Sequence, residues 1–191
     1  MGRDKASLPL ESETLLGRAV RLVSDAVGDG PIVCVAAAGQ VLPPLPKSVQ
    51  VLRDAQPHCG PLAALAVGMT ALGKRADAAF VCGCDAPRLT KAFILRMFDL
   101  LADHQVAVPF DGEHVHPLAA VYRTDTGSIA ESLLSSGKRS LVSLVNRCDS
   151  LRVPVDDLRA VDPQLASLEN CNTPDDYLRE LVAALPKRIE S

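Results

Sequence analysis

Ala78-Ala79-Phe80-Val81-Cys82-Gly83-Cys84-Asp85-Ala86-Pro87 is the stretch that decides the fold of this chain. Its apolar first half is a short continuous run, as expected for a strand that is covered on both faces of a sheet. An acidic residue and a proline follow, and a helix is predicted from Thr90, its N-cap, to Ala102. A buried strand followed by a helix is the repeating unit of α/β domains.

The same alternation extends in both directions along the chain. No repeat, low-complexity tract or linker interrupts it, so we expect a single domain over residues 1–191. The pattern predicts the α/β class, as a three-layer α/β/α sandwich with a mostly parallel sheet and a small β-arm around Asp111-Gly112. Further strands are predicted at residues 31–36, 49–52, 105–109, 115–122 and 151–155, and further helices at 15–27, 61–72, 126–135, 141–146 and 174–185.

Composition excludes several classes of protein. The chain has 191 residues, of which 48% are apolar and 23% charged, values typical of one globular domain. A net charge of −3, the absence of Trp and a 3% aromatic content argue against nucleic acid as a partner. No apolar run approaches the ~20 residues of a membrane span, and no stretch of this sequence resembles a signal peptide. The six cysteines are therefore expected to be reduced in the cytoplasm.

Asp85 is the first candidate for chemistry. Ligands of open α/β sheets bind beyond the carboxyl ends of the strands, where this residue lies. A carboxylate there can hold Mg²⁺ together with substrate phosphates. The alternative is an Asp that only shapes a turn before Pro87.

Other candidates are individually weaker. Asp54 follows a predicted strand and could accept hydrogen bonds from a nucleotide, or it is a solvated loop residue. Gly60-Pro61 allows a ligand close to the backbone, or it simply begins a helix. Lys5 could neutralise a triphosphate, or it lies on the surface. Asn170 and Asn172 precede the predicted cap Thr173, which needs neither amide, so they suggest polar ligand contacts or satisfy turn groups.

Two other kinds of site are compatible with parts of the sequence. Cys82 and Cys84 together with His114 and His116 could supply four zinc ligands, although core packing and loop placement explain the thiols equally well. A nucleophilic Ser or Cys site would need an elbow such as G-x-S-x-G, which the sequence lacks.

The order of these motifs along the chain is more specific than any one of them. The succession of these motifs resembles that of the molybdenum cofactor guanylyltransferase family, which belongs to a nucleotidyltransferase superfamily with a Rossmann-like sheet. The motifs are Gly2-Arg3-Asp4-Lys5-Ala6, Asp54 with Gly60-Pro61-Leu62-Ala63, residues 81–87, residues 117–123, Gly137-Lys138-Arg139-Ser140 and Asn170-Cys171-Asn172-Thr173-Pro174-Asp175-Asp176.

The resemblance implies transfer of GMP from GTP to a terminal phosphate of molybdopterin, with release of pyrophosphate. Lys5 would contact the triphosphate, Asp54 the guanosine, and Asp85 both GTP and Mg²⁺, and Gly60-Pro61 would also belong to the substrate-binding residues. Asn170 and Asn172 would face the pterin. Molybdoenzymes or their chaperones are the implied protein partners.

The chain also departs from the family pattern. The family's opening strand and glycine-rich phosphate loop would lie upstream of Met1, so the domain is expected to be truncated at its amino end. Without a central strand, two strand edges would face an empty slot. Residues 36–39 are Ala-Ala-Ala-Gly where the family carries a polar strand end. Two alternatives therefore stay open, a cytidylyltransferase of the same superfamily and a non-catalytic protein that binds the cofactor or a partner.

Overall fold

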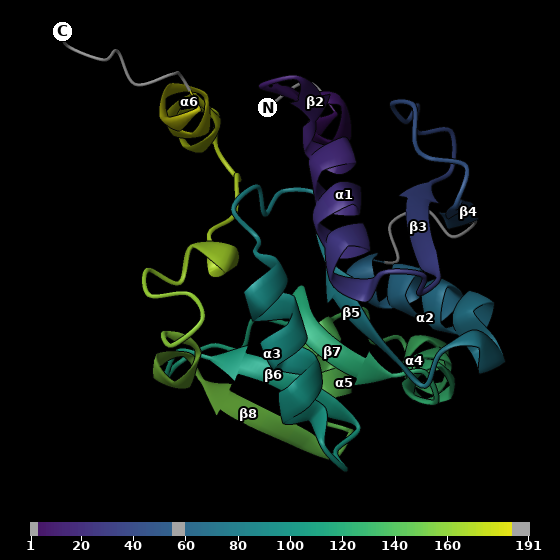
Figure 1. The fold of residues 1–191 in the computed structure, drawn as a ribbon. Coiled ribbons are helices and arrows are strands. Elements are labelled where there is room, and N and C mark those ends of the chain that lie inside the picture. Colours follow the sequence, from purple (N-terminus) through teal and green to yellow (C-terminus); the bar gives the residue numbers. More distant parts are fainter. Residues whose placement is uncertain (1–3, 55–59, 185–191) are drawn as a thin grey trace, which may run out of the picture.

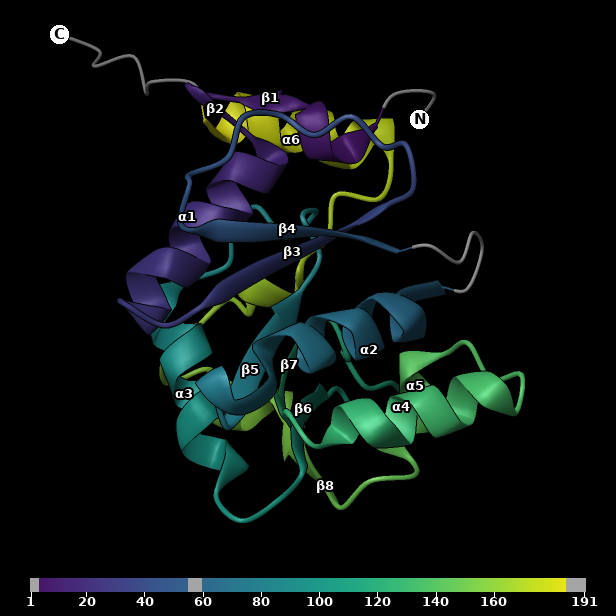
Figure 2. The same cartoon turned by 90° about the vertical axis from the view of Figure 1, so that its right-hand side faces the viewer.

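A computed structural model describes residues 4–54 and 60–184 of the chain. They form three layers, with strands between two layers of helices (Figure 1). Helices α1 and α3 cover one face of the strands, and α2, α4 and α5 cover the other (Figure 2). The predicted three-layer α/β architecture is confirmed. The helices are α1 (Leu15–Val27), α2 (Gly60–Leu72), α3 (Lys91–Leu101), α4 (Thr126–Ser135), α5 (Leu141–Val145) and α6 (Pro174–Ala183), with short 3₁₀ turns at Lys5–Ser7, Gly73–Arg75, Val155–Leu158 and Ala166–Leu168.

The strands form one four-stranded sheet and two separate pairs. The larger sheet has the order β5-β7-β6-β8, while β3 pairs with β4 in parallel and β1 pairs with β2 as a hairpin. The strands are β1 (Pro9–Leu10), β2 (Glu13–Thr14), β3 (Ile32–Ala37), β4 (Val49–Asp54), β5 (Ala78–Cys82), β6 (Val106–Phe110), β7 (Ala119–Arg123) and β8 (Ser150–Pro154).

Strand β7 is the exception to the expected parallel order. It runs antiparallel to both β5 and β6, whereas β6 and β8 are parallel. Only residues 111–118 connect β6 to β7, and a parallel crossover needs a dozen residues or more. The short arm around Asp111-Gly112 therefore returns the chain antiparallel, and the sheet is more mixed than the alternation of elements predicts.

The core consists of two apolar layers, one on each face of this sheet. Alternate residues of β7 separate them: Ala120 and Tyr122 pack with α2, α4 and α5, whereas Ala119 and Val121 pack with α3. This period of two is the strand geometry itself, since successive side chains point to opposite faces. The two layers hold the ends of β5 and β6 at one edge, where their loops emerge.

Threonine caps begin α1, α3 and α6, as the sequence predicts for α3 and α6. The Thr90 side chain accepts a hydrogen bond from the Phe93 amide at 3.2 Å. Thr173 forms a reciprocal capping box with Asp176, and Pro174 occupies the first turn. These caps place α3 and α6 directly after the two loops that carry the candidate residues 85 and 170–172.

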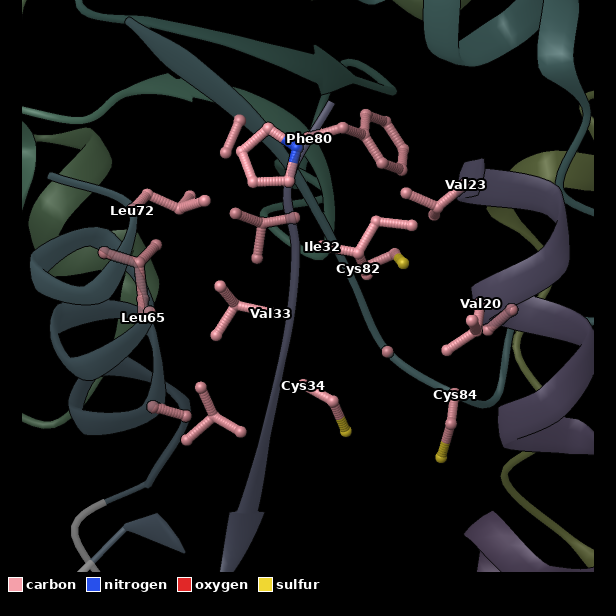
Figure 3. Close-up of a pocket in the computed structure, with 18 of the residues that line it drawn as sticks. Val20, Val23, Ile32, Val33, Cys34, Leu65, Leu72, Phe80, Cys82 and Cys84 are labelled. Carbon is pink, nitrogen blue, oxygen red and sulfur yellow. The ribbon is translucent and has the colours of Figure 1, made fainter. Parts of the chain in front are cut away.

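Strands β3 and β5 flank a slot. Within the described part of the chain they are not hydrogen-bonded to each other, and each pairs with another strand only on its far side. Between them lies an apolar cavity of about 470 Å³ that α1 and α2 cover from either side (Figure 3).

Candidate active site

Three of the predicted residues converge at the carboxyl end of β5. The Lys5 ammonium donates hydrogen bonds to Asp85 Oδ2 at 3.2 Å and to Asn172 Oδ1 at 2.9 Å. The Lys5 and Asp85 side chains are 32% and 21% exposed, so both remain accessible to a ligand. A cation, a carboxylate and an amide thus share one partly covered position, although they lie far apart in the sequence.

Gly83 makes room for the Asp85 carboxylate. A Cβ on Gly83 would lie 2.4 Å from Asp85 Oδ1, a separation that no side chain tolerates. The Asp85 carboxylate therefore lies against Gly83, in space that any side chain at this position would occupy. The sequence places Gly83 two residues before Asp85, but only the fold shows why a residue without a side chain is needed there.

Asn172 is held beside Asp85 by the backbone. The amide of Cys171 donates to the carbonyl of Asp85 at 2.7 Å, which joins the loop after β5 to the loop before α6. The backbone amides of Asn172 and Thr173 both donate to the Asp176 carboxylate, so the cap of α6 is complete without the Asn172 side chain. That amide is free to bind Lys5. The backbone carbonyl of Asn170 accepts from the Asn172 amide at 3.1 Å, and Asn170 itself is exposed.

Asp54 lies on the other side of β3, and Gly60-Pro61 begin α2. Asp54 ends β4, in register with Ala37 of β3, and the slot then separates β3 from β5. Gly60 has a φ of +71°, and a Cβ there would lie 3.0 Å from the carbonyl oxygen of Arg139. Glycine is thus required at the start of α2 by local geometry. Residues 55–59, between the two positions, lie outside the described residues.

Two functional candidates were missed in the sequence. Both oxygens of Asp4 accept from Gln40 Nε2, at 3.0 and 2.9 Å, and Gln40 Oε1 accepts from the Ala37 amide at 3.1 Å. This chain of contacts ties Asp4 to the end of β3 while the neighbouring Lys5 binds Asp85. The Ala-rich end of β3 does not indicate a role for Gln40. The position of Asp4 next to Lys5 is the one feature of the sequence that could have indicated a role for Asp4.

The five described cysteines do not form a metal site. Burial raises the pKa of the Cys82 thiol to about 12, and burial together with the nearby Asp85 carboxylate raises the pKa of the Cys84 thiol to about 11. His116 Nε2 instead lies 3.1 Å from Asp111 in the arm. Across residues 4–54 and 60–184, no three His, Cys, Asp or Glu side chains gather closely enough to hold a metal ion. The zinc alternative is therefore not supported.

Comparison with known proteins decides the family. The family of the MobA-like NTP transferase domain matches residues 1–153. The chain belongs to this family. A molybdenum cofactor guanylyltransferase of Mycobacterium tuberculosis H37Rv is 41% identical over 164 residues, which cover 83% of this chain and 79% of that protein. Its counterpart in Mycobacterium marinum is 38% identical over 181 residues, covering 92% of this chain and 84% of that protein.

Solved structures of related fold agree with this MobA-like NTP transferase domain along nearly its whole length. Molybdopterin-guanine dinucleotide biosynthesis protein A from Archaeoglobus fulgidus superimposes with a TM-score of 0.75 at 20% identity, covering 95% of this chain and 91% of that one. The 2-C-methyl-D-erythritol 4-phosphate cytidylyltransferase of Thermus thermophilus has a TM-score of 0.69 at 15% identity, covering 94% and 93%. These likenesses confirm the Rossmann-like nucleotidyltransferase fold.

A membrane span is absent from the described helices of this MobA-like domain, since none of them is both long and apolar enough to cross a bilayer.

Proposed function

We propose that this MobA-like NTP transferase transfers GMP from GTP to molybdopterin and releases pyrophosphate. The observation that carries the proposal is the convergence of Lys5, Asp85 and Asn172 at the carboxyl end of β5. The identity of 38–41% to proteins named molybdenum cofactor guanylyltransferase supplies the choice of substrates.

Lys5 is proposed to bind the triphosphate. Within the described residues, two of the three ammonium donors bind Asp85 and Asn172, and the third would be available to a phosphate oxygen. A compact ammonium neutralises phosphate charge without demanding a fixed plane of approach. An incoming phosphate would compete with Asp85 for Lys5, so binding is expected to separate that ion pair.

The donor set around Asp85 fits Mg²⁺. Its carboxylate and the Asn172 amide oxygen are hard oxygen donors, and Mg²⁺ is usually bound by one or two protein carboxylates with substrate phosphates completing the shell. Asp85 is proposed to hold the ion, with GTP phosphates as its other ligands. When bound, Mg²⁺ would neutralise charge on the phosphates as pyrophosphate leaves. A related structure, Rv0371c from Mycobacterium tuberculosis H37Rv, was solved in complex with manganese.

The proposed reaction is one in-line displacement. An oxygen of the terminal phosphate of molybdopterin attacks the α-phosphorus of GTP, and the bond from that phosphorus to the bridging oxygen breaks. The electron pair leaves with pyrophosphate, and the product carries a new phosphoanhydride bond. Such chemistry needs positioning and charge neutralisation more than covalent help. Lys5 would hold the triphosphate, and Asn170 and Asn172 would orient the pterin side of the acceptor.

Asp54 and Gly60-Pro61 are proposed to border the guanosine. Asp54 ends β4, across β3 from Asp85, and Gly60-Pro61 begin α2. A nucleotide would then extend over the end of β3 from the phosphates to the base. We also propose that the reaction takes place in the cytoplasm and that molybdoenzymes or their chaperones take up the product.

The test is a transfer assay on the purified chain with molybdopterin, Mg²⁺ and one of GTP, CTP, ATP or UTP. The release of pyrophosphate and the mass of the product are measured. We expect the guanine dinucleotide from GTP and little product from the other three. Preferential use of CTP would identify a cytidylyltransferase. Binding of molybdopterin without transfer from any nucleotide would identify the non-catalytic alternative.

A further inference from the structure

Two segments that carry the proposed site run antiparallel to each other. The loop after β5, at residues 85–90, and the segment before α6, at residues 167–172, are joined by contacts of Asp85 with Cys171, Arg88 with Glu169 and Thr90 with Ser167. The first contact is a backbone hydrogen bond of 2.7 Å, and the last runs from a backbone amide to a hydroxyl at 3.2 Å. The middle contact is an ion pair of 3.1 Å.

Arg88 holds the segment that carries the two asparagines from both of its ends. Its Nη1 lies 3.1 Å from a carboxylate oxygen of Glu169, directly before residues 170–172. Its Nε lies 2.9 Å from a carboxylate oxygen of Glu180, which follows these residues on α6. A guanidinium suits this position, because its planar fork of donors can bind two carboxylates at once. Since Arg88 comes three residues after Asp85, one side chain joins the two loops.

Few other contacts fix the position of α6. None of its residues is buried, and the helix lies outside the two helix layers (Figure 1). Its apolar contacts run from Tyr177 and Leu181 to the leucines at positions 8, 10 and 15. An open cavity of about 310 Å³ lies between α6, α1 and the loop after β5, with Arg88 and Glu180 in its walls. Because packing does not fill this space, the ion pairs of Arg88 are a large part of what holds α6 beside the loop.

Removal of Arg88 would leave neighbouring carboxylates without their counter-charge. The Glu180 side chain is only 13% exposed, and among the described residues Arg88 is its ion-pair partner. Burial raises the pKa of the Cys171 thiol, and the Glu180 and Asp85 carboxylates raise it further, so both lie within electrostatic range of that thiol. Like charges repel, and a partly buried charge without a partner is unfavourable. The segment before α6 would therefore move away from the loop after β5.

Asp85 has supports that do not involve Arg88. From the side of α1, the Arg18 Nε donates a hydrogen bond to the Pro87 carbonyl at 3.0 Å. The Asp85 carboxylate also lies against Gly83. Loss of Arg88 should therefore displace Asn172 while the Asp85 carboxylate keeps its place.

We infer that Arg88 is a positioning residue for the transfer reaction, because it fixes the side-chain amide of Asn172 relative to the Asp85 carboxylate. The inference rests on the proposed function, in which Asp85 serves GTP and Mg²⁺ and Asn172 serves the acceptor. Arg88 acts through Glu169 and Glu180 and is not itself a ligand of either substrate. Its effect on the reaction comes from geometry, since a misplacement of about 1 Å can slow a reaction about 100-fold.

The experiment compares the parent chain with Arg88→Met, Arg88→Lys and a control, Arg159→Met. Methionine removes the charge, whereas lysine restores it without the fork. Arg159 forms a similar ion pair, 2.8 Å from Asp156, but within its own turn. Exchange of the Cys171 backbone amide, which donates to the Asp85 carbonyl, is measured by NMR without substrates. The Kd for GTP with Mg²⁺ and the kcat/KM for molybdopterin are measured on the same proteins.

We expect Arg88→Met to speed exchange of the Cys171 amide at least about tenfold. The kcat/KM for molybdopterin should fall by about 10- to 100-fold, while the Kd for GTP should stay within about twofold of the parent value. Arg88→Lys should recover part of both losses, and Arg159→Met should match the parent.

The inference is overturned if exchange of the Cys171 amide is unchanged in Arg88→Met, or if it quickens while kcat/KM for molybdopterin keeps the parent value. A parallel loss of GTP binding would also overturn it, because that result would show a general effect on the fold. A parent chain that transfers no nucleotide would contradict the proposed function instead. In that case the Cys171 exchange rate, which needs no substrate, still decides whether Arg88 holds the two loops together.

Discussion

Lys5 and Asn172 are 167 positions apart in the sequence, yet the Lys5 ammonium donates to the Asn172 side-chain oxygen at 2.9 Å. Asp85, the third member of the cluster, comes from the middle of the chain. The first turn, the loop after β5 and the loop before α6 therefore meet at one position, the proposed active site. Each member of the cluster gives a prediction of its own.

Loss of the Lys5 charge should weaken binding of GTP with Mg²⁺. The Lys5→Met variant keeps the length of the side chain but removes the only described cation that contacts Asp85, and we expect an at least tenfold increase in Kd by calorimetry. The matched control is Lys74→Met, which removes the same charge from an exposed turn. Equal affinities of the two variants would contradict a role for Lys5 in phosphate binding.

The Asp85→Asn variant should lose Mg²⁺-dependent transfer while its fold is retained. Few protein ligands are available for the ion, so removal of one carboxylate should slow transfer at least tenfold, equivalent to roughly 1.4 kcal/mol in the barrier. Initial rates are measured over a range of Mg²⁺ concentrations, with the exposed Asp103→Asn as the control. An Asp85→Asn protein as active as the parent at every concentration would remove this residue from the site.

Substitutions of Asn172 and of its neighbour Thr173 should have different effects, one on molybdopterin binding and the other on the stability of the fold. Because Thr173 and Asp176 complete the cap of α6, Asn172→Ala should weaken molybdopterin binding and leave Tm nearly unchanged. The Thr173→Ala variant should show the reverse, a loss of ~1 kcal/mol in the free energy of unfolding with near-normal binding. If Asn172→Ala destabilises the protein as much as Thr173→Ala and binds normally, the amide has only a structural role.

A methyl group on Gly83 should displace the Asp85 carboxylate. The Cβ would lie 2.4 Å from Oδ1, so in Gly83→Ala the carboxylate must turn away, and we expect an activity loss approaching that of Asp85→Asn. At Gly68 the nearest atom to an added Cβ is 3.6 Å away, and Gly68→Ala is the control. Full activity and parental metal dependence in Gly83→Ala would show that the position of this carboxylate does not matter.

Acid should weaken the start of α6 before it unfolds the domain. Hydrogen bonds from the Thr173 backbone and side chain, with Arg179 nearby, lower the pKa of Asp176 from 3.8 to about 2. A carboxyl whose pKa is lower in the folded state stabilises it above its unfolded pKa, and this stabilisation is lost as the pH falls from about 4 through 2. Urea unfolding at pH 7, 4 and 3 should show a smaller pH dependence in Asp176→Asn. If the free energy of unfolding depends on pH equally in Asp176→Asn and in the parent, Asp176 is not the group that titrates.

Much of the fold was predictable because its signals are local. The apolar run at β5, the Thr90 cap and the exact helix over Leu15–Val27 each depend on residues close together in the chain. The direction of β7 was not predicted, since it depends on the length of the arm that precedes it and on which strands it joins.

The sequence by itself determined which residue types stand at the carboxyl ends of the strands, because strand, loop and cap signals act over a few positions. Only the tertiary structure decided that Lys5, Asp85 and Asn172 meet there while Asp54 lies across β3. Such meetings depend on long-range contacts such as the Cys171 amide on the Asp85 carbonyl. No local pattern encodes a hydrogen bond between segments that approach each other only when the layers pack, which is why the site could be proposed residue by residue but not assembled before the fold was known.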